Sequence, residues 1–117
     1  MTAEVVRVLM VEDNPMEADL TRFHLEKAGA HKYELAHADR IQAAVEWLGE
    51  NPSPDIILLD LHLPDCEGLD GFQKLQSIAP NVPKIILTNF YDDQLAGQAV
   101  RDGAQDYLIK KEVDTPL

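Results

Sequence analysis

Five polar residues that suit phosphoryl or metal chemistry each follow, or end, a short apolar run: Glu12, Asp13, Asp60, Thr88 and Lys110. Carboxylates that are crowded together repel one another, and a hard divalent cation such as Mg²⁺ relieves that repulsion. A carboxylate can also attack phosphorus to give an acyl phosphate, while a lysine and a hydroxyl can hold phosphoryl oxygens. Brought together, these residues would form an aspartyl-phosphate site with Mg²⁺.

The apolar runs themselves predict strands, because they are short, rich in branched side chains and bounded by turn residues. The later runs, such as DIILLD, are apolar on both faces, as in strands of a parallel sheet. Predicted strands cover residues 5–11, 33–38, 55–60, 84–88 and 106–109.

Helical patterns fill the gaps between these strands. Asn14 fits an N-cap before Pro15, and Glu17, three residues after the cap, completes a capping-box pattern. Asp39 is predicted to cap the second helix. The first helix is expected to bury one stripe, formed by Met16, Leu20 and Phe23.

Strict alternation of strand and helix predicts an α/β domain with a five-stranded parallel sheet and helices on both faces. Five strands suit the flavodoxin-like order 2-1-3-4-5, whose ligand site lies beyond the carboxyl ends of the strands. In that order the first, third and fourth strands are neighbours and the fifth lies beside the fourth. The five polar residues should therefore converge on one crevice.

Composition limits the partners. The chain has 117 residues, the size of one domain, and carries 21 acidic against 10 basic side chains, for a net charge of -11. Such a chain should repel nucleic acid and anionic membranes and favour cationic partners. Cys66 is the one cysteine, which excludes an internal disulfide. The apolar runs are too short to span a membrane and no signal peptide is apparent, so we expect a cytoplasmic protein.

The stretches VLMVEDNP, IILLDLHLPDCEG, KIILT and GAQDYLIK together resemble a response-regulator receiver domain of two-component signalling, in the CheY-like superfamily. The resemblance extends over essentially the whole chain. It implies a switch that accepts a phosphoryl group from a histidine kinase or histidine phosphotransfer protein. Such a domain is not a conventional enzyme, but it catalyses its own phosphoryl transfer and slow autodephosphorylation. The resemblance also suggests an output or kinase module beyond Leu117.

The resemblance implies roles for the matching positions. Asp60 would be the phosphoacceptor. Glu12, Asp13 and Asp60 would hold Mg²⁺ together with the backbone carbonyl of His62. Lys110 would pair with the phosphoryl group.

It also implies a switch. Thr88 would turn toward the phosphoryl group and Tyr107 would swing inward as it moves. His62, Asn89 and Phe90 lie where side chains can overhang the phosphoryl group, so we expect them to modulate its lifetime. Asn89 departs from the small residue that is usual after the threonine, and Lys111 departs from the usual proline.

Three other classes of protein have α/β folds of this kind. A pseudo-receiver would share the fold and act as a protein-interaction module without phosphorylation. A phosphoryl hydrolase of this class usually carries its aspartate nucleophile on the first strand, which here ends in Glu12, Asp13 and Asn14. A flavin-binding domain is disfavoured because these carboxylates would repel a flavin phosphate.

The predicted sheet lacks one helix. Five strands span about 24 Å, whereas one helix covers about 10 Å, so the first helix cannot cover its face alone. Thr115, Pro116 and Leu117 fit the start of another helix. We therefore expect residues 1–117 to be a receiver domain truncated before its last helix, with a natural four-helix domain as the alternative. If truncated, the excised chain should self-associate, for example as a homodimer, or be weakly stable.

Overall fold

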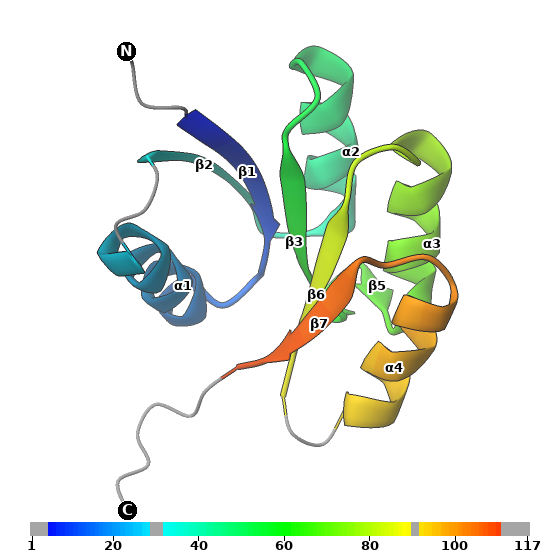
Figure 1. Cartoon of the computed structure of the whole chain (residues 1–117). Helices are drawn as coiled ribbons and strands as arrows, with labels where there is room; N and C mark the ends of the chain where they lie inside the picture. The colour runs from blue at the N-terminus through cyan, green and yellow to red at the C-terminus, as the bar shows by residue number, and fades with distance from the viewer. Residues whose placement is uncertain (1–4, 29–31, 90–91, 111–117) are drawn as a thin grey trace, which may run out of the picture.

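Five parallel strands form the central sheet of this computed structural model, which describes residues 5–28, 32–89 and 92–110 (Figure 1). The elements are β1 (Val5–Val11), α1 (Pro15–Ala28), β2 (Lys32–Ala38), α2 (Ile41–Glu50), β3 (Ile56–Asp60), β4 (His62–Leu63), β5 (Cys66–Glu67), α3 (Leu69–Ile78), β6 (Lys84–Thr88), α4 (Asp93–Arg101) and β7 (Asp106–Ile109). The helix start predicted at Thr115 lies outside the described residues.

The strand order is β2-β1-β3-β6-β7, and every adjacent pair is parallel. This confirms the predicted flavodoxin-like order. The structure adds a short antiparallel hairpin, β4 with β5, between β3 and α3, where no strand was predicted. Strands of two residues leave no periodic pattern for a sequence to show.

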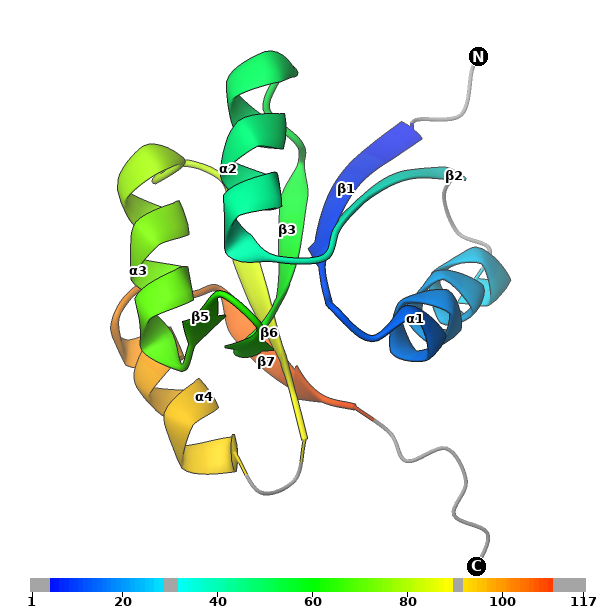
Figure 2. The same cartoon turned by 180° about the vertical axis from the view of Figure 1, so that it is seen from behind.

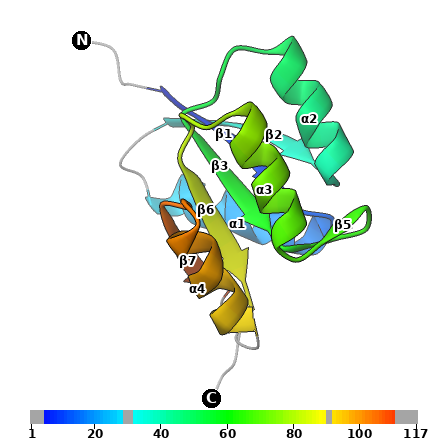
Figure 3. The same cartoon turned by 90° about the vertical axis from the view of Figure 1, so that its right-hand side faces the viewer.

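The helices divide unequally between the two faces of the sheet. Helix α1 covers one face, while α2, α3 and α4 cover the other, as the views from behind and from the side confirm (Figures 2 and 3). Among the described residues, the core on the three-helix face contains 16 buried residues, against five on the α1 face. No helix in the described part of the chain is long and apolar enough to cross a membrane.

The prediction that Met16, Leu20 and Phe23 form the buried stripe of α1 is wrong for Met16 and Phe23, whereas Leu20 is partly buried. Met16 is 74% exposed and Phe23 is 55% exposed, and the ring of Phe23 carries the Lys27 ammonium 5.5 Å from its centroid. The helix instead packs through Ala18, which is buried, with Leu25 partly buried beside it. Ala18 and Leu25 also have helical spacing, so the sequence pattern alone favoured the bulkier set with Met16 and Phe23. Close packing in the folded domain selected the small Ala18 instead.

The N-terminus of α2 is capped from a distance. Arg40 occupies the N-cap without a side-chain hydrogen bond, so the predicted local cap by Asp39 is wrong. The backbone N–H groups of Ile41 and Gln42 instead donate to the carboxylate of Asp65, each at 2.9 Å. Although burial raises the pKa of Asp65, these two bonds hold it below its usual value. A helix cap of this kind contributes about 1 kcal/mol, and here it ties the β4–β5 hairpin to α2.

Candidate functional site

All five predicted site residues lie at the carboxyl ends of the strands. Glu12 and Asp13 follow β1, Asp60 ends β3, Thr88 ends β6 and Lys110 follows β7. The strand register places Thr88 opposite Ile109, and the backbone N–H of Lys110 donates to the Thr88 carbonyl at 2.6 Å. Because the five strands run in the same direction (Figure 1), the sheet delivers Lys110 to the same edge as the carboxylates.

The Lys110 ammonium is the centre of the site. Its Nζ donates to Glu12 Oε1 at 2.8 Å, to Asp60 Oδ2 at 3.0 Å and to Glu17 Oε1 at 2.5 Å. Burial lowers the pKa of Lys110, but the hydrogen bonds to Glu12 and Glu17 and the charge of Asp60 raise it well above its usual value. Lys110 is therefore charged and held against the predicted phosphoacceptor.

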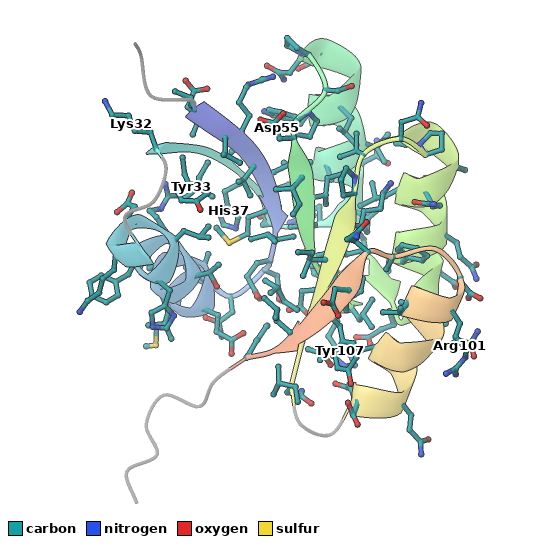
Figure 4. All side chains as sticks on the ribbon, in the orientation of Figure 1. Lys32, Tyr33, His37, Asp55, Arg101 and Tyr107 are labelled. Carbon is teal, nitrogen blue, oxygen red and sulfur yellow. The ribbon has the colours of Figure 1, made fainter. Side chains whose placement is uncertain are left out.

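Glu12 is buried, and hydrogen bonds hold both its carboxylate and its backbone carbonyl. Burial raises its pKa to about 7, and the hydrogen bond from Lys110 opposes that rise. The backbone N–H of Asn14 donates to Glu12 Oε2 at 3.2 Å, and His37 Nε2 donates to the Glu12 carbonyl at 2.7 Å. His37 thus fixes the backbone of the acidic loop from the neighbouring strand β2 (Figure 4).

Asp60 is almost fully buried, at 6% exposure, and both of its oxygens are engaged. Oδ1 accepts the backbone N–H of His62 at 2.9 Å, while Oδ2 accepts from Lys110. The loop that follows is held by a bond of 2.7 Å from the Gly68 N–H to the Leu61 carbonyl. Gly68 has φ of +70°, which side chains rarely tolerate, so the turn into α3 requires glycine.

The carboxylates of Glu12, Asp13 and Asp60 offer oxygens that all lie within 4.8 Å of one another. Glu12 and Asp60 are buried, whereas Asp13 is exposed, so water can complete a coordination shell. Hard oxygen ligands with access to water are what Mg²⁺ prefers, and the residues present therefore fit that ion. The contribution of the His62 carbonyl remains a prediction.

The two predicted switch residues, Thr88 and Tyr107, each make a hydrogen bond to a different partner. Thr88 is buried, and its Oγ1 donates to the Asn89 carbonyl at 3.2 Å. The Tyr107 hydroxyl donates to Asp93 Oδ1 on α4 at 2.8 Å, and this bond raises the pKa of Tyr107 (Figure 4). In this structure the tyrosine is thus bound to the first turn of α4.

His62 forms a bridge that the sequence did not reveal. Its ring nitrogens lie 2.7 Å from Glu67 Oε1 and 2.6 Å from Asp92 Oδ2. The hydrogen bonds to these two carboxylates raise the pKa of His62, so the ring favours the charged imidazolium that donates to both. The bridge joins the hairpin after Asp60 to the start of α4. Of the other two residues predicted to modulate the phosphoryl lifetime, Asn89 is exposed and Phe90 lies outside the described residues.

Glu17 is the residue that sequence reasoning misassigned. Asn14 caps α1 as predicted, because its Oδ1 accepts the N–H groups of Met16 and Glu17 at 2.9 and 3.2 Å. The Glu17 carboxylate, however, bonds to Lys110 and not back to the cap. The capping-box prediction fails because a lysine 93 positions away offers a charged partner.

Fold and site together define a flavodoxin-like α/β domain with an acidic, lysine-paired cluster at the carboxyl ends of its strands. The family model of the response regulator receiver domain matches residues 8–116. The chain therefore belongs to the response regulator receiver domain family of two-component signalling.

Known proteins agree with this assignment. The methanogenesis regulatory protein FilR1 of Methanothrix harundinacea is 35% identical over 89% of this chain, and LuxO of Vibrio cholerae is 37% identical over 86%. This chain covers 24% and 21% of those two proteins, about a quarter or less of their length. A receiver domain protein from Clostridium thermocellum has a TM-score of 0.78 at 28% identity, over 92% of this chain and 84% of its own.

Membership carries general properties of the family. Receiver domains are phosphoacceptors that work with histidine kinases or phosphotransfer proteins, and they generally bind Mg²⁺ through acidic residues. The cluster of Glu12, Asp13 and Asp60 is the matching feature of this chain.

Proposed function

We propose that this domain is a phosphorylation-dependent switch that accepts a phosphoryl group on Asp60, with Mg²⁺, from a histidine kinase or histidine phosphotransfer protein. One observation carries the proposal. A buried carboxylate at a strand end lies 3.0 Å from a lysine ammonium and within 4.8 Å of two further carboxylates. A nucleophile, a cation and a set of metal ligands thus occupy one place.

The protein residues divide the work of phosphoryl transfer. Asp60 supplies the oxygen that attacks phosphorus while the P–N bond of the donor phosphohistidine breaks and its imidazole leaves. The N–H of His62 holds the other carboxylate oxygen so that the attacking one is oriented. Lys110 stabilises negative charge on the phosphoryl oxygens. Glu12, Asp13 and Asp60 would hold Mg²⁺, which would neutralise charge on the transferred group. The domain then catalyses its own modification and its slow reversal by water.

The output of the switch would pass through Thr88 and Tyr107. Phosphorylation would draw the Thr88 hydroxyl away from the Asn89 carbonyl, and Tyr107 would leave Asp93 and turn inward. The surface formed by α4 and β7 would change as a result. The greater length of the relatives supports the further proposal that an output module is joined to this domain. A cytoplasmic location is a separate proposal. Sequencing the gene beyond the Leu117 codon and fractionating cells test these two points.

Incubation with acetyl phosphate and Mg²⁺ tests the function directly. We expect one phosphoryl group per chain, seen as a single mass increase that hydroxylamine removes, because an acyl phosphate is the product. A pseudo-receiver would gain no mass, and a hydrolase would consume acetyl phosphate continuously without accumulating the adduct. Either of those results would contradict the proposal.

The His62 bridge should protect the phosphoryl group. We expect His62→Ala to shorten the lifetime of the adduct several-fold, because the ring ties the hairpin after Asp60 to α4 and restricts the access of water. Decay of the adduct after removal of acetyl phosphate measures this lifetime. His24→Ala, an exposed histidine on α1, is the control. Equal lifetimes for the wild type and His62→Ala would contradict this role.

A further inference from the structure

All three donors of the Lys110 ammonium are occupied in this structure. An ammonium has three N–H groups, and Lys110 directs them to Glu12, Glu17 and Asp60. A phosphoryl oxygen that pairs with Lys110 must therefore take the place of one of these carboxylates.

The three carboxylates differ in how easily they can leave. The side chains of Glu12 and Asp60 are 1% and 8% exposed, so either would stay buried after losing its hydrogen bond to Lys110, which is costly for a polar group. The side chain of Glu17 is 44% exposed and lies on α1, apart from the sheet that carries the other two. Water can solvate Glu17 once it leaves, so this contact is the one that is cheapest to break.

We propose that Glu17 is a positioning residue that competes with the phosphoryl group for Lys110. The proposal rests on the phosphoacceptor function proposed above. Removing the Glu17 carboxylate should favour binding of the phosphoryl group for two reasons. It replaces a charge-assisted hydrogen bond to Lys110 by a weaker one in Glu17→Gln, or by none in Glu17→Ala, so a donor of Lys110 is easier to recruit. It also removes a negative charge close to the place that an anionic phosphoryl group would occupy.

The fold should tolerate the substitution that tests this. The cap of α1 uses the Asn14 side chain and the backbone N–H of Glu17, and neither is changed in Glu17→Gln. Lys110 keeps two buried carboxylate partners, so its charge remains compensated. Glu26→Gln, which removes the same charge from an exposed position further along α1, is the matched control.

Rates of adduct formation at low acetyl phosphate and affinities for beryllium trifluoride, a phosphoryl mimic, should be measured for the wild type and both variants with Mg²⁺. In Glu17→Gln we expect both quantities to rise about two- to fivefold, with an unchanged melting midpoint. Glu26→Gln should match the wild type. A residue that only preorganises Lys110 would instead lower both quantities on substitution.

Equal or lower values for Glu17→Gln, while the wild type still forms the adduct, would overturn the competition and leave the phosphoacceptor function standing. A wild type that forms no adduct would overturn both. If Glu17→Gln melts at a lower temperature, Glu17→Ala repeats the comparison below that midpoint, and the same directions apply.

Discussion

The substitution Asp60→Asn is expected to abolish formation of the acetyl phosphate adduct. The amide keeps the shape of the side chain but loses the nucleophilic oxygen and its charge. The variant should remain folded, because Lys110 retains Glu12 and Glu17 as partners. Intact-protein mass spectrometry with hydroxylamine treatment measures the adduct, and a thermal melt followed by circular dichroism reports the fold.

The control for this experiment is Asp70→Asn, which makes the same chemical change at an exposed position on α3. It should form the adduct at the wild-type rate. An adduct of equal yield in Asp60→Asn would show that another residue is the nucleophile. Loss of the cooperative melt in that variant would leave loss of the fold as the explanation, and beryllium trifluoride binding to the wild type, followed by chemical shifts of Asp60, would then identify the acceptor independently.

Addition of Mg²⁺ is expected to raise the melting temperature of the wild type. The ion would bind the assembled cluster of Glu12, Asp13 and Asp60 and not the unfolded chain, so mass action stabilises the native state. At tenfold excess over its dissociation constant the gain is about 1.4 kcal/mol, or roughly 5–10 °C for a domain of this size. Asp13→Asn should largely remove the gain.

General screening of the -11 net charge by added cations could imitate this effect. The melts should therefore be compared with NaCl of equal ionic strength, and Asp70→Asn should keep the full response to Mg²⁺. Equal midpoints in MgCl₂ and matched NaCl, together with no heat of binding by calorimetric titration, would contradict the metal site.

The sequence alone was sufficient for the main architecture. Apolar runs bounded by turn residues located β1, β6 and β7 at their observed limits, and the strict alternation with helices predicted the strand order. The predicted positions of Glu12, Asp13, Asp60, Thr88 and Lys110 at strand ends followed from that order. These predictions succeed because the carboxyl ends of parallel strands meet at one edge, whatever the details of packing.

Contacts between distant segments were decided by the tertiary structure. Asp65 caps the distant helix α2, and His62 bridges to Asp92. The Glu17 carboxylate binds Lys110 and does not form the predicted capping box. The buried face of α1 was likewise set by packing of Ala18 and not by the bulkier stripe with Met16.

The difference between the features that the sequence predicted and those that the tertiary structure set has a physical origin. Strands, helices and their order depend on periodicity and on local turn preferences, which short windows of sequence contain. The partner of a charged side chain depends on which groups the fold brings within about 3 Å, and several partners are often compatible with the same local sequence. The sequence therefore determined which residues gather at the sheet edge, and the tertiary structure decided which of them hold Lys110.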